Sequence, residues 1–182
     1  MIEKAEIDAK SQELGVHVSH VQRDYVFWDW LLAGLYQPSN PMAQILALEG
    51  GNAFRKAYFE HARYSNDLDF STLRELTEDA LTGGLGAACA FAAQHSGVDF
   101  AVREARVSAR TTEGEAGKLY KARVYFRSFY GEEEVDIRVD LDVKEFDRVI
   151  LPLQERALVH AYSDTSSCRA APSAEARGIA RL

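Results

Sequence analysis

Residues 47–72 read ALEGGNAFRKAYFEHARYSNDLDFST, and this stretch decides the fold of the chain. The apolar run Ile45–Leu48 predicts a buried strand, the pair Gly50–Gly51 predicts a turn, and Asn52–Glu60 predicts a helix. Asp67–Ser71 follows as the next predicted strand. The stretch therefore predicts a strand, a glycine turn, a helix and a second strand in close succession.

The second of these strands carries two like charges on one face. Asp67 and Asp69 lie two residues apart, so both project from the same face of the sheet while Leu68 points to the other. Mg²⁺ prefers oxygen ligands, commonly one or two carboxylates together with the phosphates of a substrate. The pair therefore indicates a Mg²⁺ site for a nucleoside triphosphate, completed by a third acid from a neighbouring strand. The alternative is that Asp-Leu-Asp is only a solvated strand edge.

A second acidic strand is predicted over VDIRVDLDV, residues 135–143. Alternation places its apolar residues on the core face and its charged residues on the opposite face. The charged residues are Asp136, Arg138, Asp140 and Asp142. Each aspartate is a candidate for the third acid, and the alternative is the wet face of an amphipathic strand.

The glycine pair fits a phosphate site, because glycine lets the backbone approach phosphates closely and the helix that follows begins with free amides. Gly50 and Gly51 are therefore candidates for triphosphate binding, with Asn52 as a side-chain contact. The basic candidates for pairing with the triphosphate are Arg55, Lys56, Lys118, Lys121 and Arg123. The sequence does not choose among them, since a glycine pair is usually a turn and such cations are usually solvated.

The remaining segments predict helices and strands around this unit. Ser19 begins a helix with a broad apolar face that ends before Pro38. Residues 72–96 have helical spacing, which the glycines of LTGGLG are expected to break in two. Residues 100–110 and 119–130 predict a β-hairpin. We therefore expect an α+β fold, a mixed sheet with flanking helices.

Length and composition favour one domain. A chain of 182 residues suits a single core, because a domain of about 150 residues already buries about 70% of its unfolded surface. We expect residues 1–18 to form a loosely attached tail or helix, residues 19–164 to form the domain, and residues 165–182 to be irregular. No apolar run reaches the roughly 18 residues of a membrane span.

Composition limits the cellular compartment and the class of partner, but it does not identify them. The charged N-terminus lacks a secretory signal, and the two cysteines show no framework or metal-ligand spacing, so we expect a cytoplasmic protein. A net charge of -7 argues against broad electrostatic binding to nucleic acid. A local basic patch beside an acidic metal site is still compatible with this charge.

The segments ALEGGNAFRK and ARYSNDLDFST resemble the Gly-Gly helix start and the Arg-x-Ser-x-Asp-Leu-Asp-Phe strand of AbiEii/AbiGii-type nucleotidyltransferase toxins. These toxins belong to the DNA polymerase β-like superfamily. VQRDYVFWDWLL upstream, and VDIRVDLDV followed by Pro152 and AYSD downstream, are similar to the flanking segments of that family. The resemblance covers residues 19–164 and implies a minimal nucleotidyltransferase core. Within the motif, Arg63 and Ser65 are implied to order the strand and its loop.

Carried over position by position, the resemblance implies roles for the site residues. Asp67, Asp69 and Asp140 would be the catalytic carboxylates that bind Mg²⁺. Asp136 and Asp142 stay as alternatives to Asp140 because all three share a face. The resemblance implies that Gly50 and Gly51 hold the triphosphate and that Lys118 or Lys121 helps to bind the nucleotide. Asn52 and Arg55 stay nucleotide-binding candidates from the residues alone.

The resemblance also implies a reaction and a setting. A nucleotide would pass from an NTP to an acceptor, with tRNA ends as the acceptor class, in a bacterial toxin-antitoxin or phage-defence pair with a separate antitoxin protein. Such relatives continue into a helical C-terminal region, which the Ala/Arg-rich end of this chain does not resemble. We therefore expect a shortened C-terminus. The second hypothesis is a catalytically inactive, truncated relative that binds nucleotide or an antitoxin partner.

Overall fold

The computed structural model describes residues 1–58, 65, 67–72, 74–111, 117–130, 135–146, 153–157, 162–164 and 177–180. The strands in this part of the chain are β1 (Leu46–Glu49), β2 (Asp67–Thr72), β3 (Arg106–Thr111), β4 (Lys118–Arg127), β5 (Asp136–Glu145), β6 (Gln154–Ala157) and β7 (Arg177–Ala180). They form one mixed sheet in the order β3, β4, β5, β2, β1, β7, β6. Two of its pairings are parallel, β2 with β5 and β1 with β7.

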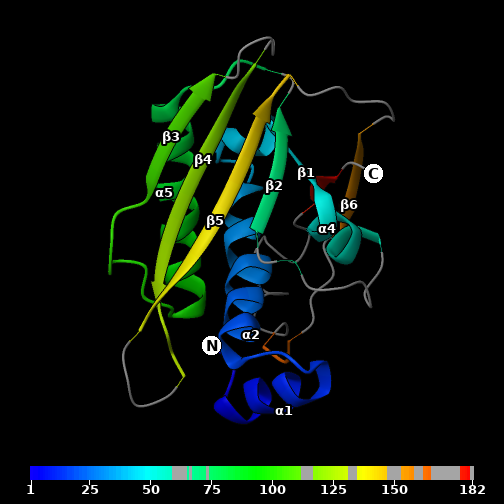
Figure 1. Ribbon diagram of the computed structural model, residues 1–182, viewed down its shortest axis with the longest axis vertical. Coiled ribbons are helices and arrows are strands. Elements are labelled where there is room, and N and C mark those ends of the chain that lie inside the picture. Colours follow the sequence, from blue (N-terminus) through cyan, green and yellow to red (C-terminus); the bar gives the residue numbers. More distant parts are fainter. Residues whose placement is uncertain are drawn as a thin grey trace.

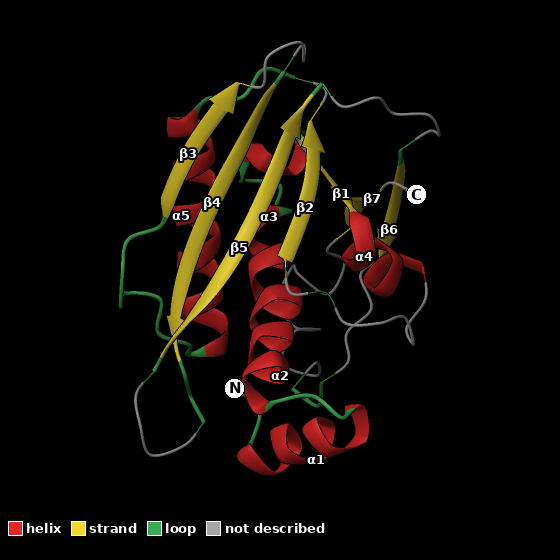
Figure 2. Cartoon of the chain, in the orientation of Figure 1, coloured by secondary structure: helices red, strands yellow, loops and turns green. Residues whose placement is uncertain are grey.

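Helices cover one face of this sheet. The α-helices in this part of the chain are α1 (Lys4–Leu14), α2 (Val18–Tyr25), α3 (Leu32–Leu35), α4 (Gly50–Ala53) and α5 (Glu78–Ser96). Short π- and 3₁₀-helical segments are Val26–Leu31, Pro41–Gln44 and Phe54–Tyr58. Figure 2 shows α2, α3 and α5 behind the strands, while the opposite face of β3, β4, β5 and β2 is open. The predicted α+β class, a mixed sheet with flanking helices, is confirmed. The open face is the one that the acidic residues occupy.

The core lies between the helices and the sheet. The inward residues of β2, Leu68 and Phe70, are fully buried, and those of β4 and β5 alternate with exposed or half-exposed neighbours. The core residues on β5 are Ile137, Val139, Leu141 and Val143, as predicted. Val135 was expected among them, but its side chain is 52% exposed because it precedes the strand.

The predicted helix from Ser19 to Pro38 is confirmed as one long helical run. α2 continues through a π-helical stretch, Val26–Leu31, into α3. The side chain of Asn40 then joins α3 to α5, because its amide donates to the carbonyls of Gly34 and Gly84 at 3.1 and 2.9 Å. A Cβ on Gly34 would lie 2.8 Å from the Ala88 backbone, so the two helices pack closely here.

The predicted break in the segment 72–96 is wrong. α5 is continuous through its three glycines, and it begins at Glu78, where the side chain of Thr77 accepts a hydrogen bond from the Ala80 amide at 3.1 Å. Each glycine disfavours a helix by about 1 kcal/mol. Packing against α3 and the hydrogen bond from Asn40 outweigh this preference, which local sequence alone does not show.

The predicted hairpin is confirmed, but its first strand is shorter than expected. β3 begins at Arg106, not at residue 100. The carboxylate of Asp99 accepts a hydrogen bond from the Ala101 amide at 2.8 Å, and this local turn replaces strand pairing. In residues 165–182, where no regular element was expected, Arg177–Ala180 form β7 and pair with β1 and β6. The other residues of that segment lie outside the described part of the chain.

The N-terminal helix packs against the domain, contrary to the expectation of a loose tail. Ile7 is fully buried in the core. The carboxylate of Asp8 accepts a hydrogen bond from the Tyr130 hydroxyl, and Glu6 accepts one from the Ser163 amide at 2.9 Å. Residues far apart in the sequence therefore hold α1 in place.

Replacing Ile7 with alanine tests this packing. We expect the free energy of unfolding to fall by about 2–4 kcal/mol, because the substitution leaves a cavity in a packed core. Leu14→Ala is the matched control, since Leu14 is on the same helix and 40% exposed. Urea denaturation monitored by circular dichroism measures both. Equal, small effects of the two substitutions would show that α1 is not part of the cooperative fold.

Candidate active site

Two parallel strands bring the predicted acids together. In the register of β2 and β5, Asp67 lies beside Asp140 and Asp69 lies beside Asp142. All four belong to the open face, since the residues that alternate with them are buried. The sheet therefore presents two pairs of carboxylates, side by side, where helices do not cover it (Figure 2).

The glycine loop lies against this acidic face. Gly50 has a φ of +71°, a left-handed conformation that glycine adopts readily. A Cβ on this residue would lie 2.6 Å from Oδ2 of Asp69. Glycine is therefore required here both by the backbone and by the close approach of the acid. Gly51 follows in the first turn of α4, so the backbone of this pair borders the carboxylates.

Two side chains near the glycine loop hold the start of β2. The amide of Asn52, which is fully buried, donates a hydrogen bond to the main-chain carbonyl of Asp67. The hydroxyl of Ser65 donates to Oδ1 of Asp67 at 3.0 Å. The expected ordering role of Ser65 agrees with this contact. Both interactions fix the backbone and the carboxylate of the first acid.

Basic side chains from β4 and β5 pair with the acids of β5. Lys121 Nζ lies 2.9 Å from Oδ2 of Asp142. Asp140 has two arginine neighbours, with Arg123 Nε at 3.4 Å from Oδ1 and Arg138 Nε at 2.8 Å from Oδ2. Asp67 and Asp69 of β2 therefore keep more uncompensated negative charge on this face than Asp140 and Asp142 of β5.

The electrostatics of Asp69 reflect this excess of negative charge. Burial raises the pKa of the Asp69 carboxyl, and the carboxylates of Asp67, Asp142 and Glu49 raise this pKa further. Glu49 lies directly opposite Asp69 in the antiparallel pair of β1 and β2. Lys144 acts in the opposite direction. Asp69 is thus held at a position that favours a nearby cation or its own protonation.

The comparison with known sequences decides the family. A profile of the nucleotidyl transferase AbiEii toxin family of type IV toxin-antitoxin systems matches residues 32–177. The chain belongs to this family. The match begins at residue 32, inside the range 19–164 that the resemblance covered, and ends at residue 177, the first residue of β7. Among curated proteins, none matches this sequence.

Solved structures give a weaker likeness. The crystal structure of JHP933 from Helicobacter pylori shares 14% identity with the AbiEii chain and has a TM-score of 0.43. A putative nucleotidyltransferase from H. pylori shares 12% identity and has a TM-score of 0.46. Each match covers 71% of this chain, but only 45% and 46% of the respective solved chains. The matched region thus spans less than half the length of those proteins.

The donor chemistry of the AbiEii chain fits Mg²⁺. Among the described residues, no group of three or more carboxylate, imidazole or thiolate side chains is arranged to hold a metal ion by itself. The acids instead form a row of hard oxygen donors along β2 and β5. Mg²⁺ commonly takes one or two carboxylates and completes its shell with water and phosphate oxygens. A row that bears excess negative charge at Asp69 suits such an ion.

Some predicted site residues lie away from the carboxylates. Asp136 is four residues before Asp140 on β5 and pairs with Arg103 at 3.0 Å. Lys118, at the start of β4, lies three residues from Lys121, toward the other end of the site. The site therefore includes Lys121, but the structure does not bring Asp136 or Lys118 to the acids of β2.

Arg55 faces the interior of the domain. It is 6% exposed, and its NH2 lies 3.5 Å from Oδ2 of the buried Asp24 on α2. The structure therefore links the segment after the glycine loop to α2 and does not place Arg55 on the open face. Arg63 and the side chain of Lys56 lie outside what the structure describes.

Sequence reasoning missed two acids, Glu49 on the acidic face and Asp24, the buried partner of Arg55. Glu49, directly before the glycine pair, accepts a hydrogen bond from the Ser71 hydroxyl at 2.8 Å on the acidic face. Glu49 lies two residues after Ala47 in β1, so the alternation of strand side chains places both residues on the same face of the sheet, and this is the signal that could have located it. Asp24 follows Val21 by three residues within an apolar helical stripe, a spacing that indicates a buried, paired charge.

Replacing Asp69 with asparagine is expected to stabilise the protein in the absence of metal. A folded-state pKa above the unfolded value of about 3.9 means that the ionised carboxylate destabilises the folded state at neutral pH. Relief of one like-charge contact is worth roughly 0.5 kcal/mol, or about 1–3 °C in Tm.

Thermal unfolding at several pH values measures this effect. The gain should be largest at neutral pH, and it should shrink as the pH falls through the folded-state pKa of Asp69 toward the unfolded value. Glu104→Gln, which removes a charge from an exposed loop, is the control and should leave Tm unchanged. A lower Tm for Asp69→Asn at neutral pH would contradict the electrostatic account.

None of the helices in the described part of the chain has the length and apolar character needed to cross a bilayer.

Proposed function

We propose that this protein is a Mg²⁺-dependent nucleotidyltransferase that moves a nucleotide from an NTP to an acceptor such as tRNA. The register of β2 and β5 carries the proposal, because it places Asp67 and Asp69 beside Asp140 and Asp142 on an open face. Gly50 adds the second element, a backbone approach that no other residue can make at this position. Membership in a nucleotidyl transferase toxin family agrees with this reaction.

The groups of the candidate site have separate tasks in this proposal. Asp67 and Asp69 would hold Mg²⁺, which when bound would supply charge stabilisation to the attacking and leaving oxygens. The backbone at Gly50 and Gly51 receives the triphosphate, where amides can donate to its oxygens. Lys121, which pairs with Asp142, lies close enough to the acids to bind a phosphate oxygen of the triphosphate in place of that carboxylate. The acceptor hydroxyl attacks the α-phosphorus and passes its proton to one of the carboxylates. The bond between the α-phosphorus and the oxygen that bridges to the β-phosphate breaks, and pyrophosphate leaves with that oxygen.

The third acid is Asp140 or Asp142. Asp140 lies beside Asp67 and is shared by two arginines, whereas Asp142 lies beside Asp69 and raises its pKa. We keep Asp140 as the third acid, because it lies beside the first acid of β2 and Arg138 holds its Oδ2. Asp142 is the alternative.

The biological setting is part of the same proposal. A type IV toxin family implies a co-encoded antitoxin protein as partner and a role in a bacterial toxin-antitoxin or phage-defence system. An acceptor such as tRNA is a cytoplasmic molecule, so we place the protein in the cytoplasm. The net charge of -7 means that RNA must be recognised by a local cluster of cations.

Incubation with each α-³²P-labelled NTP, Mg²⁺ and total bacterial tRNA tests the proposed reaction. We expect label on RNA with one or more nucleotides, and we expect EDTA to abolish it. The Asp67→Ala/Asp69→Ala double variant is the matched control. Label that is equal for the wild type and the double variant would refute the assignment of the site.

A second candidate function is a binding protein without catalysis. The pairing of Asp140 and Asp142 with cations of the chain itself favours it, because paired acids are less available to a metal. This candidate predicts a rise in Tm with NTP or with antitoxin, and no incorporation of label. The same assay with folded wild-type protein therefore separates the two functions.

A further inference from the structure

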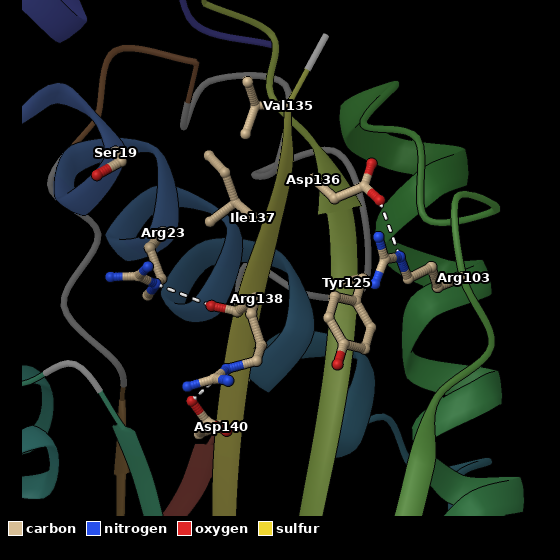
Figure 3. Close-up of a pocket in the computed structure, with 9 residues that line it drawn as sticks. All are labelled: Ser19, Arg23, Arg103, Tyr125, Val135, Asp136, Ile137, Arg138 and Asp140. Atoms are coloured by element: carbon tan, nitrogen blue, oxygen red, sulfur yellow. Dashed lines mark hydrogen bonds and ion pairs between the residues drawn. The ribbon is translucent and has the colours of Figure 1, made fainter.

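A cavity of about 650 Å³ opens beside Asp140, where the first residues of β5 extend past the start of β2. Its walls come from α2, from the segment before β3, from β4, and from residues 135–138 and 140 at the start of β5. Figure 3 shows the lining residues, among which three arginines enter from three separate segments. These arginines are Arg23, Arg103 and Arg138.

Arg23 is a partly buried cation that no carboxylate neutralises by direct contact. Its Nε donates to the main-chain carbonyl of Arg138 at 3.0 Å, and its NH1 lies 3.4 Å from Nδ1 of His20. Within the described residues, it makes no ion pair with an acid. Arginine keeps its proton in proteins, so this guanidinium stays charged and incompletely solvated. An anion that enters the cavity would therefore gain a strong partner.

The main chain explains why Arg23 is held at this place. β2 begins at Asp67, opposite Asp140, so the earlier residues of β5 extend beyond the end of β2. The carbonyl of Arg138 lies in this extension, and the guanidinium of Arg23 occupies the position where a strand partner would donate. Arg23 is thus fixed in line with the start of β2, at the carbonyl two residues before Asp140.

The two carboxylates of the cavity already have arginine partners. Asp136 pairs with Arg103 at 3.0 Å, and Asp140 pairs with Arg138 at 2.8 Å. Three arginines against two aspartates leave one positive charge, which is that of Arg23. The local charge is therefore opposite in sign to the net charge of the chain.

The cavity also has an aromatic wall. Tyr125 of β4 lines it, and the guanidinium carbon of Arg103 lies 5.3 Å from the centre of the Tyr125 ring. A flat aromatic side chain beside cations is the combination that binds single-stranded nucleic acid, because bases stack on the ring and phosphates pair with the cations. An isolated inorganic anion would not use the ring.

The position of the cavity indicates which substrate it receives. Gly50 lies against Asp69, which pairs with Asp142, whereas the cavity reaches the acids at Asp140, which lies beside Asp67. In phosphoryl-type transfer the attacking and leaving oxygens are roughly in line. The acceptor therefore approaches from the side opposite to the triphosphate.

We propose that this cavity binds the single-stranded end of an RNA acceptor, with Arg23 on a backbone phosphate and Tyr125 against a base. The inference rests on the proposed nucleotide transfer and names the surface that presents the acceptor hydroxyl to the acids. No bond is formed or broken at the cavity itself, since its residues only bind.

Fluorescence anisotropy with a short fluorescein-labelled single-stranded RNA, Mg²⁺ and no NTP tests the inference. Arg23→Ala should weaken RNA binding about tenfold, the change expected when one charge-assisted contact is lost. The slope of log K against log salt should fall in magnitude by about 0.7, as expected for one phosphate contact with a single strand. Tyr125→Ala should weaken binding with no change in this slope.

Two further variants keep the test independent of folding. Arg23→Lys keeps the charge and should retain most of the affinity. Arg110→Ala removes the same charge from an exposed position near the far end of β3, and it should bind RNA like the wild type. Unchanged RNA binding by Arg23→Ala, or an equal loss for Arg110→Ala, overturns the inference. Loss of NTP affinity in Arg23→Ala with normal RNA affinity also overturns it, since the cavity would then hold the donor.

The RNA-binding assay and the nucleotide-transfer assay test the two proposals independently. If wild-type protein binds RNA through Arg23 but incorporates no labelled nucleotide, the RNA surface stands and the proposed transfer fails. If wild-type protein incorporates label while Arg23→Ala binds RNA normally, the transfer stands and the acceptor surface lies elsewhere.

Discussion

Asp67→Ala is expected to reduce nucleotide transfer by at least about 10³-fold, which corresponds to roughly 4 kcal/mol of lost transition-state stabilisation. Asp67 lies at the centre of the candidate site, beside Asp140 and two residues before Asp69. Its side chain is exposed, and its main-chain carbonyl accepts the hydrogen bond from Asn52 in the variant as in the wild type. The fold should therefore survive the change.

Steady-state incorporation of labelled nucleotide, with circular dichroism for the fold, measures this effect. Asp79→Ala is the control, because it removes an exposed aspartate from the first turn of α5, away from the sheet face. Because Asp67 acts on the metal and not on the base, we expect kcat to fall far more than the affinity for NTP. Near-normal kcat in folded Asp67→Ala would exclude β2 as the catalytic strand.

Gly50→Ala is expected to impair both the stability and the activity of the protein. A residue with a Cβ at a φ of +71° costs about 1–2 kcal/mol in backbone strain. The new Cβ would also lie 2.6 Å from Oδ2 of Asp69, so the carboxylate must move. A misplacement of catalytic groups by about 1 Å lowers a rate by about 10²-fold. Transfer assays and urea denaturation of the same preparation separate the two effects.

Gly86→Ala is the matched control for this substitution. Gly86 lies on the exposed side of α5, and a Cβ there would meet nothing within 4 Å. Alanine at this helical position should stabilise the protein by about 0.5–1 kcal/mol and leave transfer unchanged. A Gly50→Ala protein with normal stability and activity would mean that the glycine loop does not approach Asp69 as the structure shows.

The sequence was sufficient to predict the central unit of the fold. The two glycines and the alternation of Asp67, Leu68 and Asp69 are local signals, and the observed strands β1 and β2 match them closely. The face of β5 that carries Asp140 followed from the same period of two. The resemblance to the AbiEii family rested on the same motifs, and the family profile matches residues 32–177, which include them.

The remaining features depend on contacts between distant segments. Whether Asp140 or Asp142 lies beside Asp67 depends on the register of two parallel strands, which local pattern does not determine. The continuity of α5 depends on Asn40, and the ion pair of Arg55 depends on Asp24. The positive charge beside Asp140 arises because α2 brings Arg23 to a strand more than a hundred residues later.

A crystal structure with Mn²⁺ and a non-hydrolysable NTP analogue tests the central claim most directly. We expect anomalous density for Mn²⁺ between Asp67, Asp69 and one acid of β5, with the triphosphate at Gly50 and Gly51. The same map would identify Asp140 or Asp142 as the third ligand. Nucleotide bound elsewhere, or Mn²⁺ absent from the acids of β2 while nucleotide is bound, would contradict the assignment of this face as the active site.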